Sequence, residues 1–556
     1  MSQDHRDSRG PRHSRDDRRD DRRDDRGSDR RDSRGRQRNR RGMADRQFSS
    51  SAPSQRNRGA DPARLAAYRT LRAVEANDAY GNLVLPEQIR RLGLNRRDAA
   101  LATELAYGAL RQQGTWDAVL ARCVDRPLAK IDPSVLDALR LGTHQLLAMR
   151  IPDHAAIDQT VGLTRSEIGA GPSGLVNAVL RKVAAEDLTQ WLAKLTDGAD
   201  QLTRLSLETS HPVWIVRAMK QALTVHGRRS GELTDLLAAD NAAPSVHLVA
   251  LPGLGELEPE IEHGAQPSTL VPGAAISGGG DLRRSPQVRE GRVRVQDAGS
   301  QLVARSVVAA APVQPGERWL DLCAGPGGKA ALLAAAAAET GAHLLANEVA
   351  GHRADLVRQA LAVVPDRAWS VRAGDGREIT AADAGRRALS DGSDEGSREG
   401  SQEAGPTGFD RILVDAPCTG LGALRRRPES RWRRTPRDLA ELTVLQLELL
   451  QAAADALAPG GLLVYATCSP HAAETTVAVD DLLRTRPGLQ LVDAGAPVRK
   501  AALPGALAGD ADPARPYAGA QGAHAAADAA TVQLWPHVHG TDAMFIAHFR
   551  QTRISE

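Results

Sequence analysis

Apolar residues recur at helical spacing between positions 61 and 185. In each segment they fall three or four positions apart, as in Leu65, Tyr68, Leu71 and Val74. The breaks between segments fall at Pro127, Pro133, Pro152 and Pro172, where helices should begin or end. This pattern predicts six or seven short helices, and we assign residues 61–190 to an all-α domain.

The pattern changes twice after this region. Helical spacing continues to about residue 240, and short extended runs then follow at 245–251 and 291–297, separated by Gly- and Pro-rich sequence. We assign residues 191–296 to linker helices and a small α+β connector. From residue 313, apolar strands alternate with helical stretches, which is typical of an open, mostly parallel α/β sheet. We therefore assign residues 297–556 to an α/β domain.

The strands of this last domain can be placed from their apolar runs. We expect them at 318–322, 343–347, 369–373, 411–415 and 462–467, with a final antiparallel pair near 532–535 and 543–549. Ligands of such sheets bind at the carboxyl ends of the strands. Candidate site residues should therefore directly follow these runs.

Composition adds a tail and two insertions to this picture. The 556 residues carry a formal charge of +3, but residues 1–60 hold 19 Arg against 11 Asp, so the remainder is at −5. The Arg/Asp-rich tail has almost nothing apolar and is predicted to be disordered, either contacting RNA loosely or simply solvated. Low-complexity insertions at 381–408 and 497–530 are predicted to be mobile surface loops.

Two classes of protein are excluded at this point. The longest apolar run, at 331–338, is far too short to cross a bilayer, so we expect no membrane association. The four cysteines are widely spaced without a C-x-x-C pair, which argues against disulfides and against a zinc site. We expect a cytoplasmic protein with reduced thiols and no metal.

A glycine-rich turn follows the first strand of the α/β domain. Gly325, Gly327 and Gly328 let the backbone approach a ligand at the N-terminus of an alanine-rich helix. The spacing also meets the loose dinucleotide fingerprint, which is a weak signal. A P-loop is disfavoured, because Cys323 stands where its first glycine would be and Ala330 replaces its Ser/Thr.

Three carboxylates follow the neighbouring strands, namely Glu348, Asp375 and Asp415. Acids around one glycine turn suit a ligand with a ribose, an amino-bearing base and a cationic centre. This description fits S-adenosylmethionine better than a pyrophosphate dinucleotide. Glu348 could hold a ribose hydroxyl at the end of its strand.

The sharper signal is a pair of cysteines at strand ends. Cys418 follows the fourth predicted strand and Cys468 follows the fifth. If those strands are neighbours, about 4.8 Å apart, both thiols face one pocket. Carbon 5 of cytosine takes a methyl group only after a thiolate adds to carbon 6, so a cysteine site beside a methyl donor suits cytosine methylation.

The motifs resemble a known family. DAPCTGLGALRRRPESRWRR (415–434), ATCSP (466–470) and LDLCAGPGGKA (320–330) resemble the RNA 5-methylcytosine methyltransferases. Segments 96–120, 131–147 and 174–183 resemble the NusB-type RNA-binding domain. Together they are similar to the RsmB (Fmu/Sun) family of 16S ribosomal RNA cytosine methyltransferases, which implies a C-terminal class I, Rossmann-like, S-adenosylmethionine-dependent domain.

The resemblance also implies roles for single residues. Cys468 would attack carbon 6, Cys418 would help to release the product, and Asp415 would contact the base and the donor. Glu348 would take the ribose of S-adenosylmethionine and Asp375 its adenine. The remaining donor-binding residues would be Cys323, Ala324, Gly325, Pro326, Gly327, Gly328 and Lys329.

The implied substrate is RNA. The family methylates carbon 5 of a cytosine in 16S ribosomal RNA, at position 967, so the partner would be 16S ribosomal RNA or a small-subunit assembly intermediate, bound by a monomer. Arg425, Arg426, Arg431 and Trp432 follow the catalytic turn and are expected to contact phosphate and base, although a solvated charge run remains an alternative. The target base must be unstacked to reach the pocket.

Three other functions remain open. The chain could be a NusB-like RNA-binding assembly or antitermination factor with a vestigial sheet domain. It could methylate cytosine in another RNA. A nicotinamide-dependent oxidoreductase rests only on the loose glycine pattern and has no use for paired cysteines.

Overall fold

The structure is a computed structural model that describes residues 60–77, 79–385, 408–517 and 525–552. The predicted tail at 1–60 lies outside the described residues except for its last position. Of the predicted insertion at 381–408, residues 386–407 also lie outside them. Within the described ranges, no helix is both long and apolar enough to cross a membrane.

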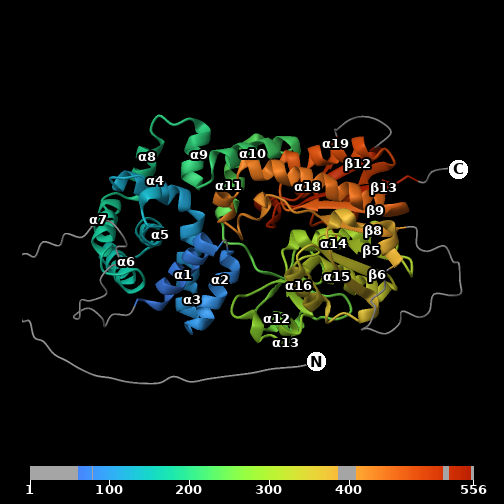
Figure 1. Cartoon of the computed structure of the whole chain (residues 1–556), viewed down its shortest axis with the longest axis horizontal. Helices are drawn as coiled ribbons and strands as arrows, with labels where there is room; N and C mark the ends of the chain where they lie inside the picture. The colour runs from blue at the N-terminus through green and yellow to red at the C-terminus, as the bar shows by residue number, and fades with distance from the viewer. Residues whose placement is uncertain (1–59, 78, 386–407, 518–524, 553–556) are drawn as a thin grey trace, which may run out of the picture. The chain divides into compact units, whose positions relative to one another are not determined.

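Seven helices form the N-terminal region (Figure 1). The predicted helix start near Pro133 is confirmed, because Asp132 accepts a hydrogen bond from the Ser134 amide and caps the fifth helix. The inward positions of these helices bury two apolar clusters, as their spacing predicted. The helices are α1 (Pro62–Asn77), α2 (Gly81–Arg91), α3 (Arg96–Arg111), α4 (Gln113–Cys123), α5 (Pro133–Leu147), α6 (Asp153–Glu167) and α7 (Ser173–Val183).

The middle region is helical and then mixed, as expected. Its helices are α8 (Leu188–Thr196), α9 (Gln201–Thr209), α10 (Val213–Val225) and α11 (Leu233–Asn241). A four-stranded sheet of order β2-β3-β1-β4 follows. It comprises β1 (His247–Ala250), β2 (Gln266–Pro267), β3 (Ala274–Ile276) and β4 (Val293–Val295), with the short helices α12 (Glu258–Glu262) and α13 (Pro286–Arg289).

The C-terminal region is built on a nine-stranded mixed sheet of order β11-β12-β10-β13-β9-β8-β5-β6-β7. Its parallel half runs from β9 to β7. These strands are β5 (Arg318–Asp321), β6 (His343–Glu348), β7 (Trp369–Ala373), β8 (Phe409–Asp415) and β9 (Leu457–Thr467). The other half, in which all pairings except the parallel β10–β12 pair are antiparallel, contains β10 (Leu489–Asp493), β11 (Ala514–Pro516), β12 (Ala525–Gln533) and β13 (Phe545–Gln551).

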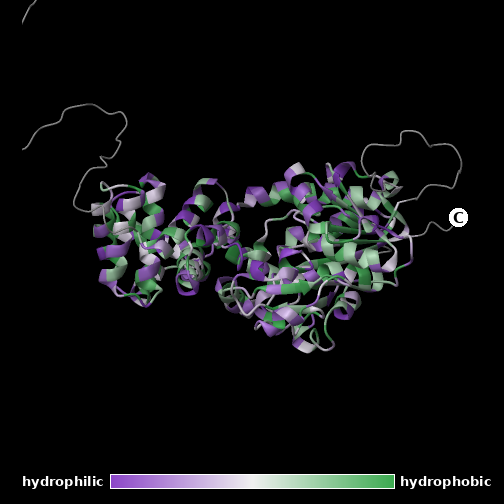
Figure 2. Cartoon of the chain, turned by 90° about the horizontal axis from the view of Figure 1, so that it is seen from below, coloured by the Kyte–Doolittle hydropathy of each residue, from purple (hydrophilic) through white to green (hydrophobic). Residues whose placement is uncertain are grey.

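Helices cover both faces of this sheet. One buried cluster joins the sheet to α14 (Ala298–Ala309), α15 (Gly328–Thr340) and α16 (Gly351–Leu361), and a second joins it to α18 (Pro436–Asp455) and α19 (Thr476–Thr485). Figure 2 shows the strands between them coloured mostly as hydrophobic. The observed layers confirm the predicted open α/β sheet.

The prediction of a mobile loop at 497–530 is wrong for the described part of that segment. Helix α20 (Gly495–Ala501) buries Val498 and Ala501 in the sheet's core. Strand β12 begins at Ala525 and pairs with both β10 and β13. An alanine-rich sequence looks featureless, but alanine is small enough to fill a tightly packed layer. The sequence reading also missed β10 and β11.

A buried arginine joins the start of the sheet to the helix before it. Arg411 on β8 is 3% exposed, and its guanidinium contacts the Glu317 carboxylate at 2.7 Å. It also donates to the carbonyl oxygens of Val307 and Val308 at the end of α14. Charge this deep must be paired, so the arginine fixes α14 against the strand that leads to Cys418.

We predict that Arg411→Met lowers the free energy of unfolding of the sheet region by about 3 kcal/mol, because the partly buried Glu317 carboxylate loses its charged partner and the carbonyls of Val307 and Val308 lose a donor. Chemical denaturation followed by tryptophan fluorescence measures the change. The matched control is Arg437→Met, which removes an exposed pair with Glu441 on α18 and should cost less than about 1 kcal/mol. Equal losses in the two variants would contradict this assignment.

Candidate active site

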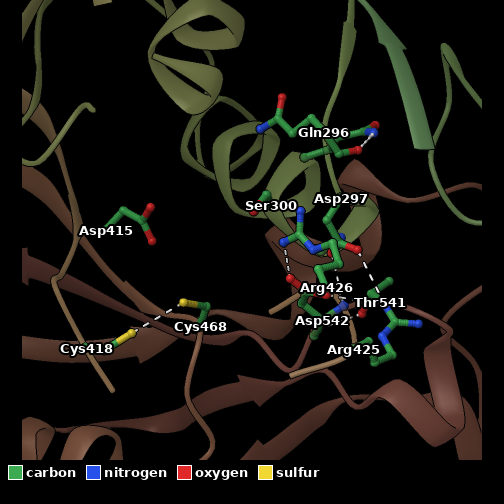
Figure 3. Close-up of polar contacts among 12 residues, drawn as sticks. Gln296, Asp297, Ser300, Asp415, Cys418, Arg425, Arg426, Cys468, Thr541 and Asp542 are labelled. Atoms are coloured by element: carbon green, nitrogen blue, oxygen red, sulfur yellow. Dashed lines mark hydrogen bonds and ion pairs between the residues drawn. The ribbon is translucent and has the colours of Figure 1, made fainter. Parts of the chain in front are cut away.

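Two thiols meet at the carboxyl ends of β8 and β9. These strands are parallel neighbours, with Asp415 opposite Ala466, so Cys418 and Cys468 leave the sheet at the same edge. Their sulfur atoms are 3.4 Å apart and point toward each other (Figure 3). The expectation that the two cysteines lie close together at neighbouring strand ends agrees with this geometry.

Backbone hydrogen bonds hold the turn that carries Cys418. The Gly422 amide donates to the Cys468 carbonyl at 2.8 Å, and the Ala543 amide donates to the Gly422 carbonyl at 2.9 Å. Glycine is required at 422, because a Cβ there would meet the Ala543 carbonyl oxygen at 2.1 Å. The turn is further tied down by buried Thr419, whose amide donates to the Glu474 carboxylate at 2.8 Å. The two sulfurs are therefore held by the backbone.

The pKa values of the two thiols are shifted in opposite directions. A hydrogen bond from Cys418 lowers the pKa of Cys468 below its usual value, against the effect of burial, and the nearby Lys329 ammonium acts in the same sense. The same hydrogen bond, together with burial, raises the pKa of Cys418. These opposite shifts make Cys468 the more acidic thiol of the pair and Cys418 the less acidic one.

A buried ion pair lies beside the thiols. Lys329 Nζ contacts Asp415 Oδ2 at 2.7 Å and Ser300 Oγ at 3.3 Å. Burial alone would favour the neutral amine, but the Asp415 carboxylate raises the pKa of Lys329 and keeps it charged. The pair joins the glycine turn to the end of β8 and places a cation near Cys468.

The glycine turn lies against the end of β6. The Gly325 amide donates to Glu348 Oε2 at 3.1 Å, and a Cβ at position 325 would meet that oxygen at 2.2 Å. Gly327 has φ +103°, which favours glycine, and it precedes the first residue of α15. Glu348 is buried and pairs with Arg353 at 3.2 Å. The structure thus brings residues 323–329 and Glu348 together, as the sequence predicted.

Asp375 lies one strand farther along, after β7. It caps the short helix η6 (Gly376–Glu378) and contacts Arg377 at 2.6 Å, which lowers its pKa. Acidic groups therefore follow β6, β7 and β8, with the glycine turn after β5 between them. Cys323 in the glycine turn has its pKa raised by burial, so its thiol is not activated.

Asp321 is a site residue that sequence reasoning missed. It is the last residue of β5 and 1% exposed, and burial followed by repulsion from Asp415 raises its pKa to about 7. A buried acid poised in this way at a strand end marks a polar ligand site. The signal was present, since Asp321 directly precedes the glycine turn, but it looked like part of the strand.

This donor set fits S-adenosylmethionine. Gly325 has no room for a side chain beside Glu348, so the groups that this part of the turn can offer a ligand are its backbone and the Glu348 carboxylate. Acids at three strand ends supply acceptors for ribose hydroxyls, an adenine amine and a cationic centre. No group of three or more His, Cys, Asp or Glu side chains in the described ranges is arranged to hold a metal ion.

The expectation that Arg431 contacts RNA is wrong for this structure. Arg431 is fully buried, and Nη1 donates to the carbonyls of Arg111 and Ser210 and to Asn241 Oδ1, while Nη2 donates to the Asp240 carbonyl. These partners lie at the ends of helices in the first half of the chain. The guanidinium therefore connects the segment after Cys418 to those helices and has no surface to offer a phosphate.

Arg425 is corrected in the same way. It is 6% exposed, and it contacts Asp542 at 3.4 Å and Asp297 at 3.6 Å (Figure 3). Arg426 also pairs with Asp542 but keeps 39% of its side chain exposed, and Trp432 is 36% exposed. An arginine run after a catalytic turn thus divides into buried members and exposed members, which one sequence cannot separate. Arg426 and Trp432 remain candidates for RNA contact.

Comparisons with known proteins agree with this site. A family model described as 16S rRNA methyltransferase RsmB/F matches residues 308–550, and the NusB family model matches residues 61–185. The putative methyltransferase Rv1407 of Mycobacterium tuberculosis is 44% identical over 501 residues, which cover 89% of this chain and 98% of that protein.

Named relatives extend the match. Ribosomal RNA small subunit methyltransferase B of Salmonella paratyphi C is 32% identical over 455 residues, covering 80% of this chain and 96% of the relative. The protein of the same name from Pseudomonas syringae pv. tomato is 34% identical over 440 residues, covering 77% and 88%. The crystal structure of PH0851 shares the fold, with a TM-score of 0.67 and 22% identity over 88% of this chain and 98% of that chain.

The matches to long relatives above 30% identity and the two family models agree with the helical region, the sheet region and the motifs described above. The chain therefore belongs to the 16S rRNA methyltransferase RsmB/F family and carries a NusB-family domain at its N-terminal side.

Proposed function

We propose that this protein transfers a methyl group from S-adenosylmethionine to carbon 5 of a cytosine in 16S ribosomal RNA through a covalent adduct of Cys468. The observation that carries this proposal is the 3.4 Å contact between the Cys418 and Cys468 sulfurs beside the Lys329–Asp415 pair. Methylation of oxygen or of an exocyclic nitrogen needs no thiol, whereas methylation of carbon 5 needs a nucleophile at carbon 6.

The first step is addition of Cys468 to the base. Its thiolate Sγ bonds to carbon 6, the 5,6 double bond opens, and the electron pair moves to carbon 5, which becomes nucleophilic. The lowered pKa of Cys468 raises the fraction of this thiol that is present as the reactive thiolate. In this proposal Asp415, which pairs with Lys329, accepts a hydrogen bond from the exocyclic amine of cytosine.

When bound, S-adenosylmethionine supplies the electrophilic methyl group that carbon 5 takes. In this proposal the glycine turn 323–329, Glu348 and Asp375 hold the donor.

Release reverses the addition. The carbon 5 proton leaves to water, the 5,6 double bond reforms, and the bond between Cys468 Sγ and carbon 6 breaks, so that Cys468 departs as a thiolate. The Cys418 thiol, whose sulfur lies 3.4 Å from that of Cys468, donates a hydrogen bond to the departing thiolate. Without this donor the leaving group is poorer, and the adduct should persist.

The choice of 16S ribosomal RNA rests on the relatives that are named ribosomal RNA small subunit methyltransferase B. Position 967, the target that the family resemblance implies, is the first nucleotide to examine. The two other protein classes considered have less support: an assembly factor would not need an activated thiol beside a donor turn, and a nicotinamide enzyme would not need paired cysteines.

We predict that Cys418→Ala accumulates a covalent protein–RNA adduct in the presence of S-adenosylmethionine, whereas Cys468→Ala forms none and loses methyl transfer by more than about 10³-fold. Denaturing gel electrophoresis of labelled small-subunit RNA detects the adduct. Cys123→Ala, which alters a buried cysteine of α4, is the control and should turn over normally. Turnover by Cys468→Ala at the wild-type rate would refute the mechanism.

The pH dependence of thiol reactivity provides a second test. Because the Cys418 hydrogen bond lowers the pKa of Cys468, we predict that alkylation of Cys468 by iodoacetamide rises with a midpoint below the usual thiol value of about 8.5. In Cys418→Ala the thiolate loses this donor, so its pKa rises and the midpoint moves to higher pH. Mass spectrometry of the Cys468 peptide across pH gives both midpoints. An unchanged or lower midpoint in the variant would contradict the assigned direction.

A further inference from the structure

We propose that Gln296 binds the amino-acid end of S-adenosylmethionine, an assignment that rests on the proposed function and adds a residue to its donor site. Gln296 precedes α14. It belongs neither to the glycine turn nor to the group of acids at the strand ends. Three observations lead to it: an unpartnered buried amide, its position against the glycine turn, and the order of the strands.

The amide of Gln296 is buried without a partner. The residue is 7% exposed, and neither Oε1 nor Nε2 has a hydrogen-bond partner among the described residues. Buried side-chain amides are nearly always hydrogen-bonded, because an unmade bond costs the full desolvation of the group. An unpaired buried amide beside a ligand site is therefore a candidate to form a hydrogen bond with the ligand.

The main chain around Gln296 is well fixed. Its amide donates to the His247 carbonyl at 3.0 Å, and its own carbonyl accepts from Gln301 Nε2 at 2.9 Å. Asp297 next to it caps α14 by accepting from the Gly299 amide at 2.9 Å. These hydrogen bonds fix the main chain from which the Gln296 side chain extends. The lack of partners for the side-chain amide is therefore not explained by a loosely held segment.

The side chain faces the start of α15. A Cβ on Gly328 would have the Gln296 amide as its nearest neighbours, with Cδ at 3.7 Å, Nε2 at 3.8 Å and Oε1 at 4.0 Å. Gly328 is the first residue of a 13-residue helix, whose first amides lack intrahelical partners and carry partial positive charge. The Gln296 amide and this helix terminus thus border the same space, on the side of Ser300 and across from Asp415 in Figure 3.

The strand order identifies the part of the donor that belongs there. A sulfonium has three substituents: the methyl group, the adenosyl group and the amino-acid chain. The methyl group must face Cys468 after β9, and the adenosyl group extends toward Glu348 and Asp375 after β6 and β7. The amino-acid chain is left for the turn after β5, where Gln296 lies.

The chemistry of the two partners is complementary. The amino-acid end carries a carboxylate and an ammonium, and an amide offers one donor group and one acceptor. Nε2 would donate to the carboxylate together with the free amides of α15, which also favour an anion. Oε1 would accept from the ammonium. A carboxylate at position 296 would still accept from the ligand's ammonium, but it would repel the ligand's carboxylate.

The test compares two ligands that differ only at this end. S-adenosylhomocysteine keeps the amino-acid chain, and 5′-methylthioadenosine lacks it. We expect Gln296→Leu to weaken S-adenosylhomocysteine about 10-fold or more in calorimetric titration of the full chain, because hydrogen bonds to charged groups are lost. Affinity for 5′-methylthioadenosine should stay within about twofold, which also shows that the variant site is folded.

Two further variants sharpen the result. Gln296→Glu should weaken S-adenosylhomocysteine at least as much as Gln296→Leu, through repulsion of the ligand carboxylate. Gln533→Leu removes an equally buried amide on β12, 2% exposed with an unpartnered Oε1, and should change neither affinity.

Equal weakening of both ligands by Gln296→Leu, or no weakening of either, would overturn the assignment. The proposed function fails differently: there the wild-type protein would bind S-adenosylhomocysteine and still make no 5-methylcytosine. The two hypotheses can therefore be rejected separately.

Discussion

The parallel pairing of β8 with β9 is the constraint on which the rest of the site depends. Because parallel strands end at the same edge of a sheet, the register that sets Asp415 opposite Ala466 also brings Cys418 to 3.4 Å from Cys468. A turn hydrogen-bonded to Cys468 and to Ala543 then holds that distance. Neither thiol alone would be distinctive. Their contact makes Cys468 more acidic than Cys418, and the proposed addition and release use this difference.

Several buried charges around this pair have a partner of opposite sign. Lys329 with Asp415 lies on the donor side, and Arg425 with Arg426 contacts Asp542 and Asp297. Inside a protein such groups are stable only when they are paired, so they also fix the segments that carry them. Arg431 extends the same principle, since its buried guanidinium joins the segment after Cys418 to helices far away in sequence. A feature that resembled an RNA-binding run is in large part internal support.

Much of the fold and the candidate site could be predicted from sequence where one residue type has one plausible environment. Apolar runs gave β5, β6 and β7 to within one residue, and acids directly after them marked the ligand edge. Prediction failed where environment is decided by tertiary contacts. Arg431 and Arg426 are alike in sequence, yet one is buried and the other half-exposed. The alanine-rich segment 497–530 lacked periodic signals, yet Val498 and Ala501 in its described part pack into the core of the sheet, while Gln296 and Asp321 acquire significance only through burial.

The central claim is that the methyl group goes to carbon 5 of cytosine. The most direct measurement incubates the full chain with unmethylated 16S ribosomal RNA and S-adenosylmethionine carrying an isotopically labelled methyl group. The RNA is then digested to nucleosides and analysed by mass spectrometry against authentic standards. The account predicts the label in 5-methylcytidine. Label in an N-methylated or ribose-methylated nucleoside, with none in 5-methylcytidine, would contradict it.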